Sequence, residues 1–136
     1  MRLYLVQHGD AVPEQVDPQR PLSATGRREV EAIGRLLASA GVRLTRVVHS
    51  GKLRAEQTAE LLAMACAPDH GVEASAGLSP NDPVKPVART IASRPMDTML
   101  VGHLPFMARL AGRRRRARGA ANLTGSILPP RFSGHA

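Results

Sequence analysis

The stretch that decides the fold lies near the amino end, Leu3-Tyr4-Leu5-Val6-Gln7-His8-Gly9-Asp10. An apolar, β-type run ends here in a histidine that is followed by a glycine. In open α/β sheets, ligands bind just beyond the carboxyl ends of the strands. A buried strand that ends in His8 therefore predicts a nucleophile or ligand there, against the alternative of a hydrogen-bonded structural histidine. Gly9 lacks the Cβ that would crowd an approaching ligand.

Further along the chain, short β-type runs alternate with segments whose apolar residues recur at helical spacing. The expected strands are 2–6, 45–49, 72–74 and 98–101, and the expected helices are 23–40, 53–67, 84–93 and one that starts at Leu104-Pro105. A repeated strand–helix order is typical of a mostly parallel sheet flanked by helices. The predicted fold class is therefore α/β, with three layers in the order α/β/α.

The length and composition restrict the class of protein. A chain of 136 residues is long enough for one domain with a real core and short for two. The sequence contains neither an apolar run of about 18 residues nor a secretory signal pattern. A single cysteine, Cys66, excludes an internal disulfide. We expect a cytoplasmic protein, because a lone cysteine is typical of a reducing compartment.

The positive charge is concentrated at one end of the chain. Residues 1–112 hold 13 Lys and Arg against 11 Asp and Glu, a net charge of +2, whereas residues 113–136 hold 6 Arg and no acid. We therefore predict a domain over 1–112 and a basic, weakly ordered tail over 113–136. Arginine runs can bind nucleic acid electrostatically. No aromatic residue lies within the run to stack on bases, so nucleic acid is not the expected partner.

Two of the expected strands end in a histidine. His8 and His103 both follow strand carboxyl ends, which face the same edge of a parallel sheet, so the two rings can share one pocket. Arg54 lies near a helix start, and helix N-termini and arginine both favour phosphate. This set predicts a phosphoryl site in which one imidazole attacks phosphorus and the other groups stabilise charge. The alternative for paired histidines is zinc, but no zinc-binding spacing accompanies them.

Five short segments together form a pattern more specific than any one of them. They are Leu5-Val6-Gln7-His8-Gly9-Asp10-Ala11, Pro21-Leu22-Ser23-Ala24-Thr25-Gly26, Ser50 with Leu53-Arg54-Ala55-Glu56-Gln57-Thr58, Leu78-Ser79-Pro80 and Val101-Gly102-His103-Leu104-Pro105. With these motifs the chain resembles the histidine phosphatase superfamily, which has the phosphoglycerate-mutase-like fold. Within that superfamily it resembles the small bacterial phosphohistidine phosphatases of the SixA type.

The resemblance implies roles for the matching residues. His8 matches the phosphorylated nucleophile, Arg54 matches the second phosphate-clamping arginine, and His103 matches the second pocket histidine. The family works without a metal or other cofactor. The SixA-type proteins lack the long inserts that shape sugar-phosphate pockets. This short chain is similar, which favours an open site for a phosphohistidine of a protein partner.

The sequence departs from the family pattern at three places. Gln7 stands where the family has an arginine, so the phosphate loses one charge-assisted hydrogen bond, at a cost of about tenfold in binding. Gly51 replaces the usual proline after Ser50, a change that we expect to be tolerated. Residues 113–136 do not resemble the strand material that normally follows the last helix. A degenerate tail there would deprive the sheet of an edge strand.

The remaining candidate residues carry alternatives. Asp82 is the candidate general acid, and its other interpretation is a turn or helix-cap aspartate before Pro83. Gly9 and Ser50 are candidate substrate contacts, together with Gln7. The predicted function is a metal-independent phosphatase that acts on a protein phosphohistidine through a phospho-His8 intermediate. The alternatives are a phosphatase for small phosphate esters and a non-catalytic phosphate- or phosphoprotein-binding module.

Overall fold

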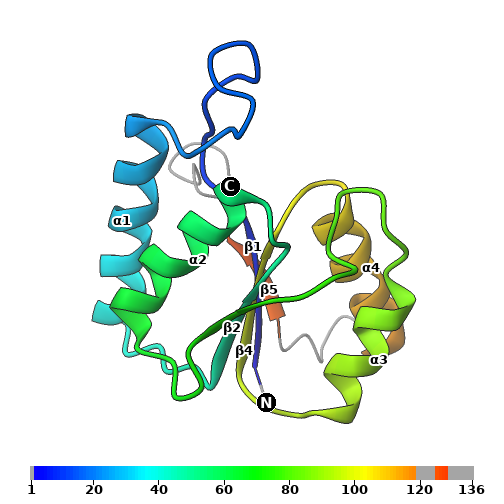
Figure 1. Ribbon diagram of the computed structural model, residues 1–136. Coiled ribbons are helices and arrows are strands. Elements are labelled where there is room, and N and C mark those ends of the chain that lie inside the picture. The colour runs from blue at the N-terminus through cyan, green and yellow to red at the C-terminus, as the bar shows by residue number, and fades with distance from the viewer. Residues whose placement is uncertain (1, 119–124, 129–136) are drawn as a thin grey trace.

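The computed structural model describes residues 2–118 and 125–128 (Figure 1). Strands and helices alternate along the chain, as the sequence predicts. The elements are β1 (Leu3–Gln7), α1 (Ala24–Ser39), β2 (Arg46–His49), α2 (Leu53–Cys66), β3 (Val72–Ala74), α3 (Lys85–Ser93), β4 (Thr98–Gly102), α4 (Phe106–Arg118) and β5 (Gly125–Leu128). None of the helices in this described part is long and apolar enough to cross a membrane.

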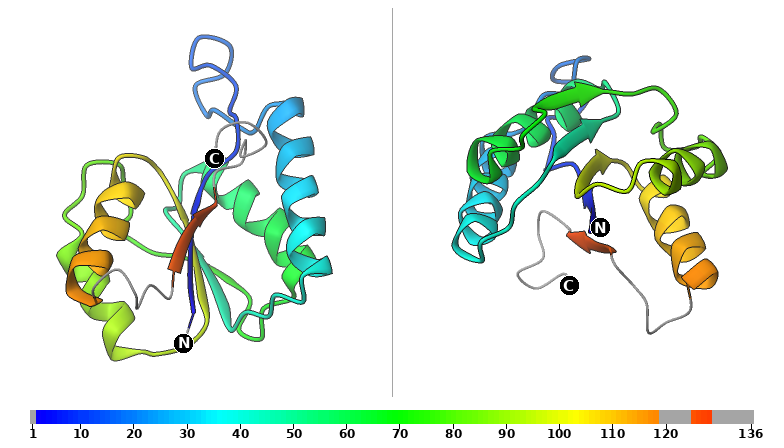
Figure 2. Two further views of the ribbon diagram at one scale, coloured as in Figure 1. Left: turned by 180° about the vertical axis from the view of Figure 1, so that it is seen from behind. Right: turned by 90° about the horizontal axis from the view of Figure 1, so that it is seen from below.

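The strands form one sheet in the order β3-β2-β4-β1-β5, and every pairing is parallel. Helices α1 and α2 cover one face of the sheet, and α3 and α4 cover the other (Figures 1 and 2). This arrangement confirms the predicted three-layer α/β/α fold. Because the strands are parallel, the residues that follow β1, β2 and β4 all lie at one edge, which we call the carboxyl edge.

Alternation along each strand explains why the central strands are apolar throughout. In β1, Leu3 and Leu5 face the cluster beneath α3 and α4, whereas Val6 faces the cluster beneath α1 and α2. In β4, Leu100 faces the cluster beneath α3 and α4, and Val101 faces the cluster beneath α1 and α2. A parallel strand with helices on both faces buries both sets of side chains. These strands therefore read as continuous apolar runs.

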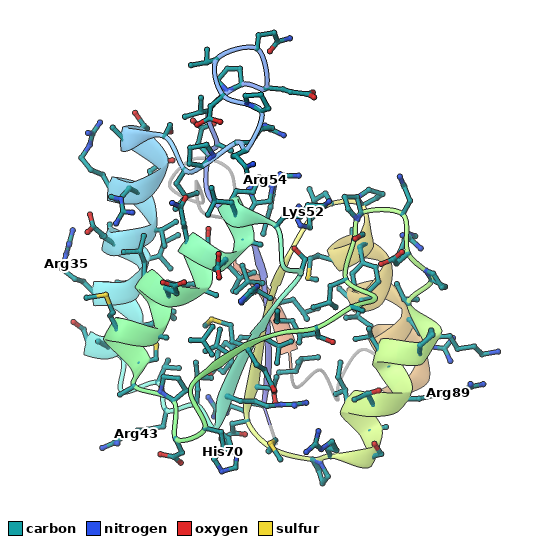
Figure 3. All side chains as sticks on the ribbon, viewed as in Figure 1. Arg35, Arg43, Lys52, Arg54, His70 and Arg89 are labelled. Carbon is teal, nitrogen blue, oxygen red and sulfur yellow. The ribbon has the colours of Figure 1, made fainter. Side chains whose placement is uncertain are left out.

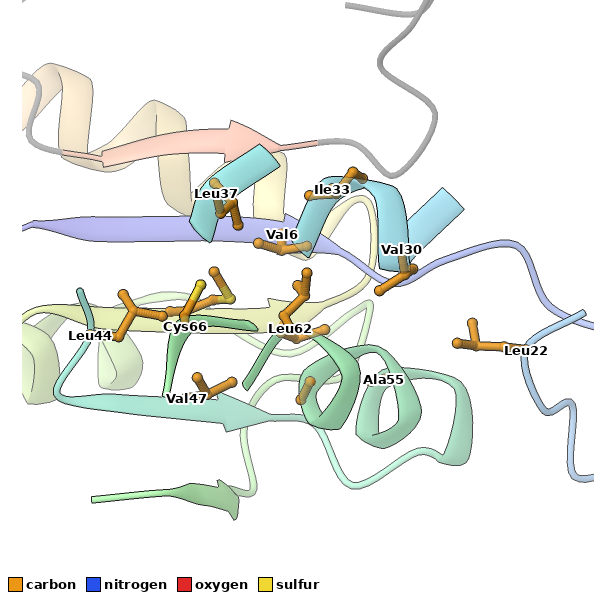
Figure 4. Close-up of a cluster of buried hydrophobic side chains, with 13 residues drawn as sticks. Val6, Leu22, Val30, Ile33, Leu37, Leu44, Val47, Ala55, Leu62 and Cys66 are labelled. Atoms are coloured by element: carbon orange, nitrogen blue, oxygen red, sulfur yellow. The ribbon is translucent and has the colours of Figure 1, made fainter. Parts of the chain in front are cut away.

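The core beneath α1 and α2 is the larger of the two apolar clusters (Figure 4). In α1 the buried positions follow the predicted helical spacing, and they are Gly26, Val30, Ile33, Gly34 and Leu37. A Cβ on Gly34 would lie 3.1 Å from the Cβ of Ala65, so glycine at this position lets α1 approach α2 closely. Cys66 is buried in the same cluster, and burial raises the pKa of its thiol.

Local signals set most of the helix boundaries. The Ser23 side chain accepts the backbone N–H of Gly26 at 3.0 Å and so caps α1. Helix α2 ends at Cys66, and its C-cap residue Ala67 has a left-handed φ of 45°. The last helix begins at Phe106, so Pro105 lies just before the helix rather than inside its first turn, a correction to the sequence prediction.

The predicted tail, residues 113–136, includes the end of α4 and the strand β5. Helix α4 runs across residue 112 to Arg118, and β5 pairs in parallel with β1. The sheet therefore has a fifth strand, β5, as its outer strand beside β1. Ile127 and Leu128 belong to this strand. The remaining residues of the predicted tail, 119–124 and 129–136, lie outside the described part of the chain. A domain border at residue 112 and a weakly ordered tail stay predictions.

Candidate active site

Two histidines from different strands meet at the carboxyl edge. The backbone N–H of His8, which follows β1, donates to the carbonyl of Gly102 at the end of β4 at 2.9 Å. This bond extends the parallel ladder, in which Gln7 is paired with Gly102. The rings of His8 and His103 have centroids 4.9 Å apart and are tilted by 58°. The predicted juxtaposition of the two histidines is therefore present.

Hydrogen bonds on both ring nitrogens determine the tautomer of His8. Its Nδ1 lies 2.7 Å from the carbonyl oxygen of Gly9, a contact in which the nitrogen must donate. The Nε–H of Arg54 donates to Nε2 of His8 at 3.3 Å, so Nε2 is the acceptor. Burial lowers the pKa of His8, and the positive charges of Arg54 and Arg20 lower it further. His8 thus presents an Nε2 lone pair beside a guanidinium group.

Gly9 connects the loop after β1 to the helices. Its N–H donates to the Thr58 hydroxyl at 3.0 Å, and that hydroxyl donates to the Arg54 carbonyl at 2.8 Å. A Cβ on Gly9 would lie 2.8 Å from Val30 and 3.0 Å from Leu22. The space that glycine leaves is thus filled from within the protein, where α1 packs against the loop. Contact between Gly9 and a substrate stays a prediction.

His103 is almost completely enclosed, with 2% of its surface exposed. Its Nε2 lies 2.7 Å from the hydroxyl oxygen of Ser50, which follows β2. Burial lowers the pKa of His103 to about 3, with further lowering by the charges of His8, Arg54 and Lys52. The ring is therefore neutral at physiological pH. Its Nδ1 is buried and has no hydrogen-bond partner within the described residues.

The loop after β2 has its own internal support. His49 is buried, and its Nδ1 accepts the N–H of Gly51 at 3.0 Å. Gly51 has a φ of +92°, a value that proline cannot adopt, and proline has no N–H to donate. The replacement of the family's proline by glycine is therefore accompanied by a different local backbone. This loop leads directly into α2 and Arg54.

Two carboxylates, those of Asp10 and of the candidate general acid Asp82, hold loops in place. Asp10 accepts the hydroxyl of Ser23 at 2.7 Å, while its backbone carbonyl accepts the Ser23 N–H at 2.9 Å. The Asp82 carboxylate accepts the N–H of Ser79 at 2.8 Å. That bond is the one expected of a turn aspartate, which was the alternative for Asp82. A general-acid role for Asp82 stays a prediction.

One family model matches the sequence. The model of the histidine phosphatase superfamily (branch 1) matches residues 3–79, more than half of the chain. The chain belongs to this superfamily. Gln7, His8 and Arg54 lie within the matched segment, whereas His103 lies beyond it.

The solved structures that resemble this phosphatase-family chain include two SixA proteins. The protein histidine phosphatase SixA complexed with tungstate is 25% identical, with a TM-score of 0.74 over 95% of this chain and 83% of that one. A protein assigned as phosphohistidine phosphatase SixA from Agrobacterium tumefaciens is 25% identical, with a TM-score of 0.68 over 90% and 86% of the two chains. No curated protein matches the sequence.

A third solved structure shows that the fold is shared more widely. The ecdysone phosphate phosphatase of Bombix mori, also in complex with tungstate, is 13% identical. Its TM-score is 0.68 over 88% of this chain and 79% of that one. At this identity the likeness concerns the fold alone.

Sequence reasoning missed two cations near the histidine pair. Arg20 has a left-handed φ of 49°, and its Nε–H donates to the Val12 carbonyl at 3.1 Å. Its charge lowers the pKa of His8, His103 and Arg54. The sequence did contain a signal for Arg20, because this residue directly precedes the family-matching segment Pro21–Gly26.

The second cation is Lys52, which precedes the first residue of α2. Figure 3 shows Lys52 and Arg54 at the end of the sheet where β1 finishes. The charge of Lys52 lowers the pKa of His103. Gln7, the half-buried last residue of β1, is neutral. The described carboxyl edge therefore places positive charge around the His8–His103 pair although the family's arginine at position 7 is missing.

No group of three or more His, Cys, Asp or Glu side chains within the described residues is placed to hold a metal ion.

Proposed function

We propose that the protein is a phosphohistidine phosphatase that acts through a covalent phospho-His8 intermediate and requires no metal. The observation that carries this proposal is the hydrogen bonding of His8. Its Nδ1–H is committed to Gly9, and its Nε2 accepts from Arg54. An imidazole held in this tautomer has its nucleophilic lone pair on Nε2, next to a group that binds phosphate.

The reaction proceeds in two displacements at phosphorus. Nε2 of His8 is freed when the Arg54 N–H that it accepts moves to a phosphoryl oxygen of the substrate. Nε2 then forms the new N–P bond while the bond between phosphorus and the leaving nitrogen breaks, and the leaving imidazole, protonated on its other nitrogen, takes the electron pair and departs as a neutral ring. Water then attacks the phospho-His8 phosphorus, the N–P bond electrons return to Nε2, and both protons of the water depart with the phosphate as dihydrogen phosphate. Transfer of this kind depends chiefly on positioning and on stabilising charge at the phosphoryl oxygens.

Arg54, Arg20 and His103 stabilise that charge in this proposal. Arg54 already contacts Nε2, the atom to which phosphorus becomes bonded. His103 contributes as a neutral donor, because burial lowers its pKa to about 3. A buried donor with no protein partner is available for a substrate oxygen, which is what the unpaired Nδ1 of His103 provides if it carries the proton.

Ser50 selects that tautomer of His103. Its hydroxyl oxygen accepts the Lys52 N–H at 3.4 Å, which leaves its proton free to donate to Nε2 of His103 at 2.7 Å. An Nε2 that accepts places the ring proton on Nδ1. Ser50 is therefore a positioning residue in the proposal, and a direct contact with phosphate is not needed.

The substrate class follows from the leaving group. The Asp82 carboxylate is engaged with Ser79 in its own turn, and Asp10 is engaged with Ser23. An imidazole that is protonated on its second nitrogen leaves as a neutral ring and needs less help from a general acid than an alkoxide does. A phosphoramidate substrate therefore fits this site better than an alkyl phosphate ester, and a SixA neighbour described as a protein histidine phosphatase supports the same class.

The test is hydrolysis of a phosphohistidine peptide in the presence of EDTA. Wild-type protein should release phosphate and become labelled on histidine by radioactive substrate, whereas His8→Ala should do neither. His70→Ala is the matched control, because His70 is an exposed histidine far from the carboxyl edge (Figure 3). Activity that survives in His8→Ala, or that EDTA abolishes, would contradict the proposal.

Gln7 gives a specific reason to consider a second function, a non-catalytic module that binds phosphoproteins. The neutral side chain weakens the clamp at the position where the family has an arginine. Folded wild-type protein that binds the phosphopeptide without releasing phosphate would favour this module over the enzyme. Restoration of turnover by Gln7→Arg would then identify position 7 as the cause.

A further inference from the structure

The sheet and α3 enclose a cavity that none of the candidate catalytic residues lines. It has a volume of about 270 Å³ and lies between α3 and the face of the sheet formed by β2 and β3. Its floor is apolar and consists of buried side chains of the cluster beneath α3 and α4, namely Val48, Leu78, Ile91 and Leu100. Ligand sites typically combine such an apolar surface with a few polar groups that orient the ligand.

The polar groups at this cavity are mostly cationic. Arg46 and Arg94 both line it, and Glu73 is the one acid among the lining residues. Arg46 begins β2 and lies at the amino edge of the sheet, whereas Arg94 caps the end of α3. The cavity therefore has a net positive charge, and none of the candidate catalytic residues lines it.

Arg46 has unused donors beside this cavity. Its side chain is only 11% exposed, and its NH1 forms an ion pair with Glu73 at 3.0 Å. A guanidinium group carries five N–H donors, and the ion pair engages one of them. A carboxylate or sulfonate that enters the cavity can accept from the terminal N–H groups that remain, because guanidinium groups favour oxyanions.

We propose that this cavity, which we call the α3 pocket, binds a small amphipathic anion. The apolar part of the ligand packs on Val48, Leu78 and Ile91. Its anionic group lies between Arg46 and Arg94, where it accepts from their guanidinium N–H groups. The α3 pocket is thus a ligand site additional to the phosphoryl site, and binding there does not depend on the proposed chemistry of His8.

The experiment uses 8-anilinonaphthalene-1-sulfonate as the probe, titrated against the full chain by fluorescence. We expect saturable binding of one probe molecule, with backbone amide shifts by NMR at residues 75–78 and 90–94. The neutral analogue N-phenyl-1-naphthylamine, which has the same apolar body without the sulfonate, should bind about tenfold more weakly because it lacks the charge-assisted hydrogen bonds.

Two variants and one control locate the anionic group. Arg94→Gln removes an exposed charge and should weaken probe binding severalfold, and Arg46→Met should weaken it further. Arg89→Gln is the matched control, because Arg89 is an exposed arginine of the same helix that does not line the pocket (Figure 3). Binding that does not saturate would overturn the proposal, as would equal affinity in Arg94→Gln and wild type. Amide shifts centred on residues 8–10 would also overturn it.

Discussion

The two faces of the sheet differ in how they are joined to the candidate active site. On the α1/α2 face, buried or half-buried hydrogen bonds connect the helices to the loop after β1, through Thr58 to Gly9 and through Gln57 to the N–H of Leu22 at 2.7 Å. On the α3/α4 face, the exposed Arg109 holds the loop at Pro80 and Asp82 by its carbonyl oxygens, each at 3.0 Å.

This difference shows which side of the molecule sets the position of His8. Buried hydrogen bonds are costly to break because the freed groups lose water as well as their partner. The α1/α2 face therefore holds His8 rigidly. The α3/α4 face contributes a loop that is held only by surface hydrogen bonds, and it can keep a cavity of about 270 Å³ open without loosening His8.

The largest expected effect comes from removing the guanidinium group that the α1/α2 face supplies. Arg54→Ala should lower kcat for phosphohistidine hydrolysis by roughly 10²–10³-fold, because a preorganised donor to the developing charge is lost. Arg35→Ala, at an exposed position of α1, should leave kcat unchanged (Figure 3). Steady-state kinetics with both variants provides the measurement, and a loss of less than tenfold in Arg54→Ala would show that Arg54 is not part of the clamp.

The second effect concerns acid stability at the histidine pair. His103 has a folded-state pKa of about 3, below the ordinary value of 6.5, so the unfolded chain binds a proton in this interval that the folded chain does not. Stability is thus lost as the pH falls from about 6.5 toward 3, at up to about 1.4 kcal/mol per pH unit for this group.

Urea unfolding between pH 7 and pH 4 measures this loss. His103→Gln should make the free energy of unfolding less dependent on pH over that interval. His70→Gln, an exposed histidine, provides the control. An unchanged slope in His103→Gln would mean that His103 takes up its proton without penalty in the folded state.

The third effect compares the stability contributions of two threonines, one on each face of the sheet. Thr58 and Thr90 are both helical threonines whose hydroxyls donate to the carbonyl four residues earlier, but only Thr58 also accepts a loop N–H. Thr58→Val should lower the free energy of unfolding by about 1–3 kcal/mol, because the buried N–H of Gly9 loses its acceptor. Thr90→Val, on exposed α3, should change it by less than about 0.5 kcal/mol. Equal losses in chemical denaturation would show that the Thr58 bond adds nothing beyond helix packing.

The smallest expected effect is a gain in binding affinity. Gln7→Arg should tighten binding of tungstate or phosphate by about tenfold, because a charge-assisted bond replaces a neutral one. Gln19→Arg adds the same charge at an exposed loop position and should have little effect. Isothermal titration calorimetry compares the two variants. Equal affinities would indicate that Arg20 and Lys52 already supply the charge that position 7 lacks.

Much of the site could be predicted because its determinants are local. A strand that ends in histidine, twice in a parallel sheet, brings His8 and His103 to one edge whatever the rest of the chain does. The position of Arg54 near a helix start was equally readable from the sequence around Ser50. In both cases the pattern within a few residues determines that the side chain lies at the carboxyl edge.

The supporting interactions could not be predicted, because they join residues that are distant in sequence. The bond between Gly9 and Thr58 spans 49 positions, and the bond between Ser50 and His103 spans 53. The role of Gly9 also changed with the structure. Sequence suggested room for a ligand, whereas the fold places Val30 and Leu22 where a Cβ would be.

By itself, the sequence determined the α/β class, the order of the elements and the two histidines at the carboxyl edge, because periodicity and strand ends are properties of neighbouring residues. Only the tertiary structure decided that Arg20 lies near the histidine pair, that Ser50 contacts His103, and that Arg46 and Arg94 line one cavity. Each of these depends on which surfaces meet after the chain has folded. Such contacts arise from packing and from the path of the loops, which no local pattern encodes.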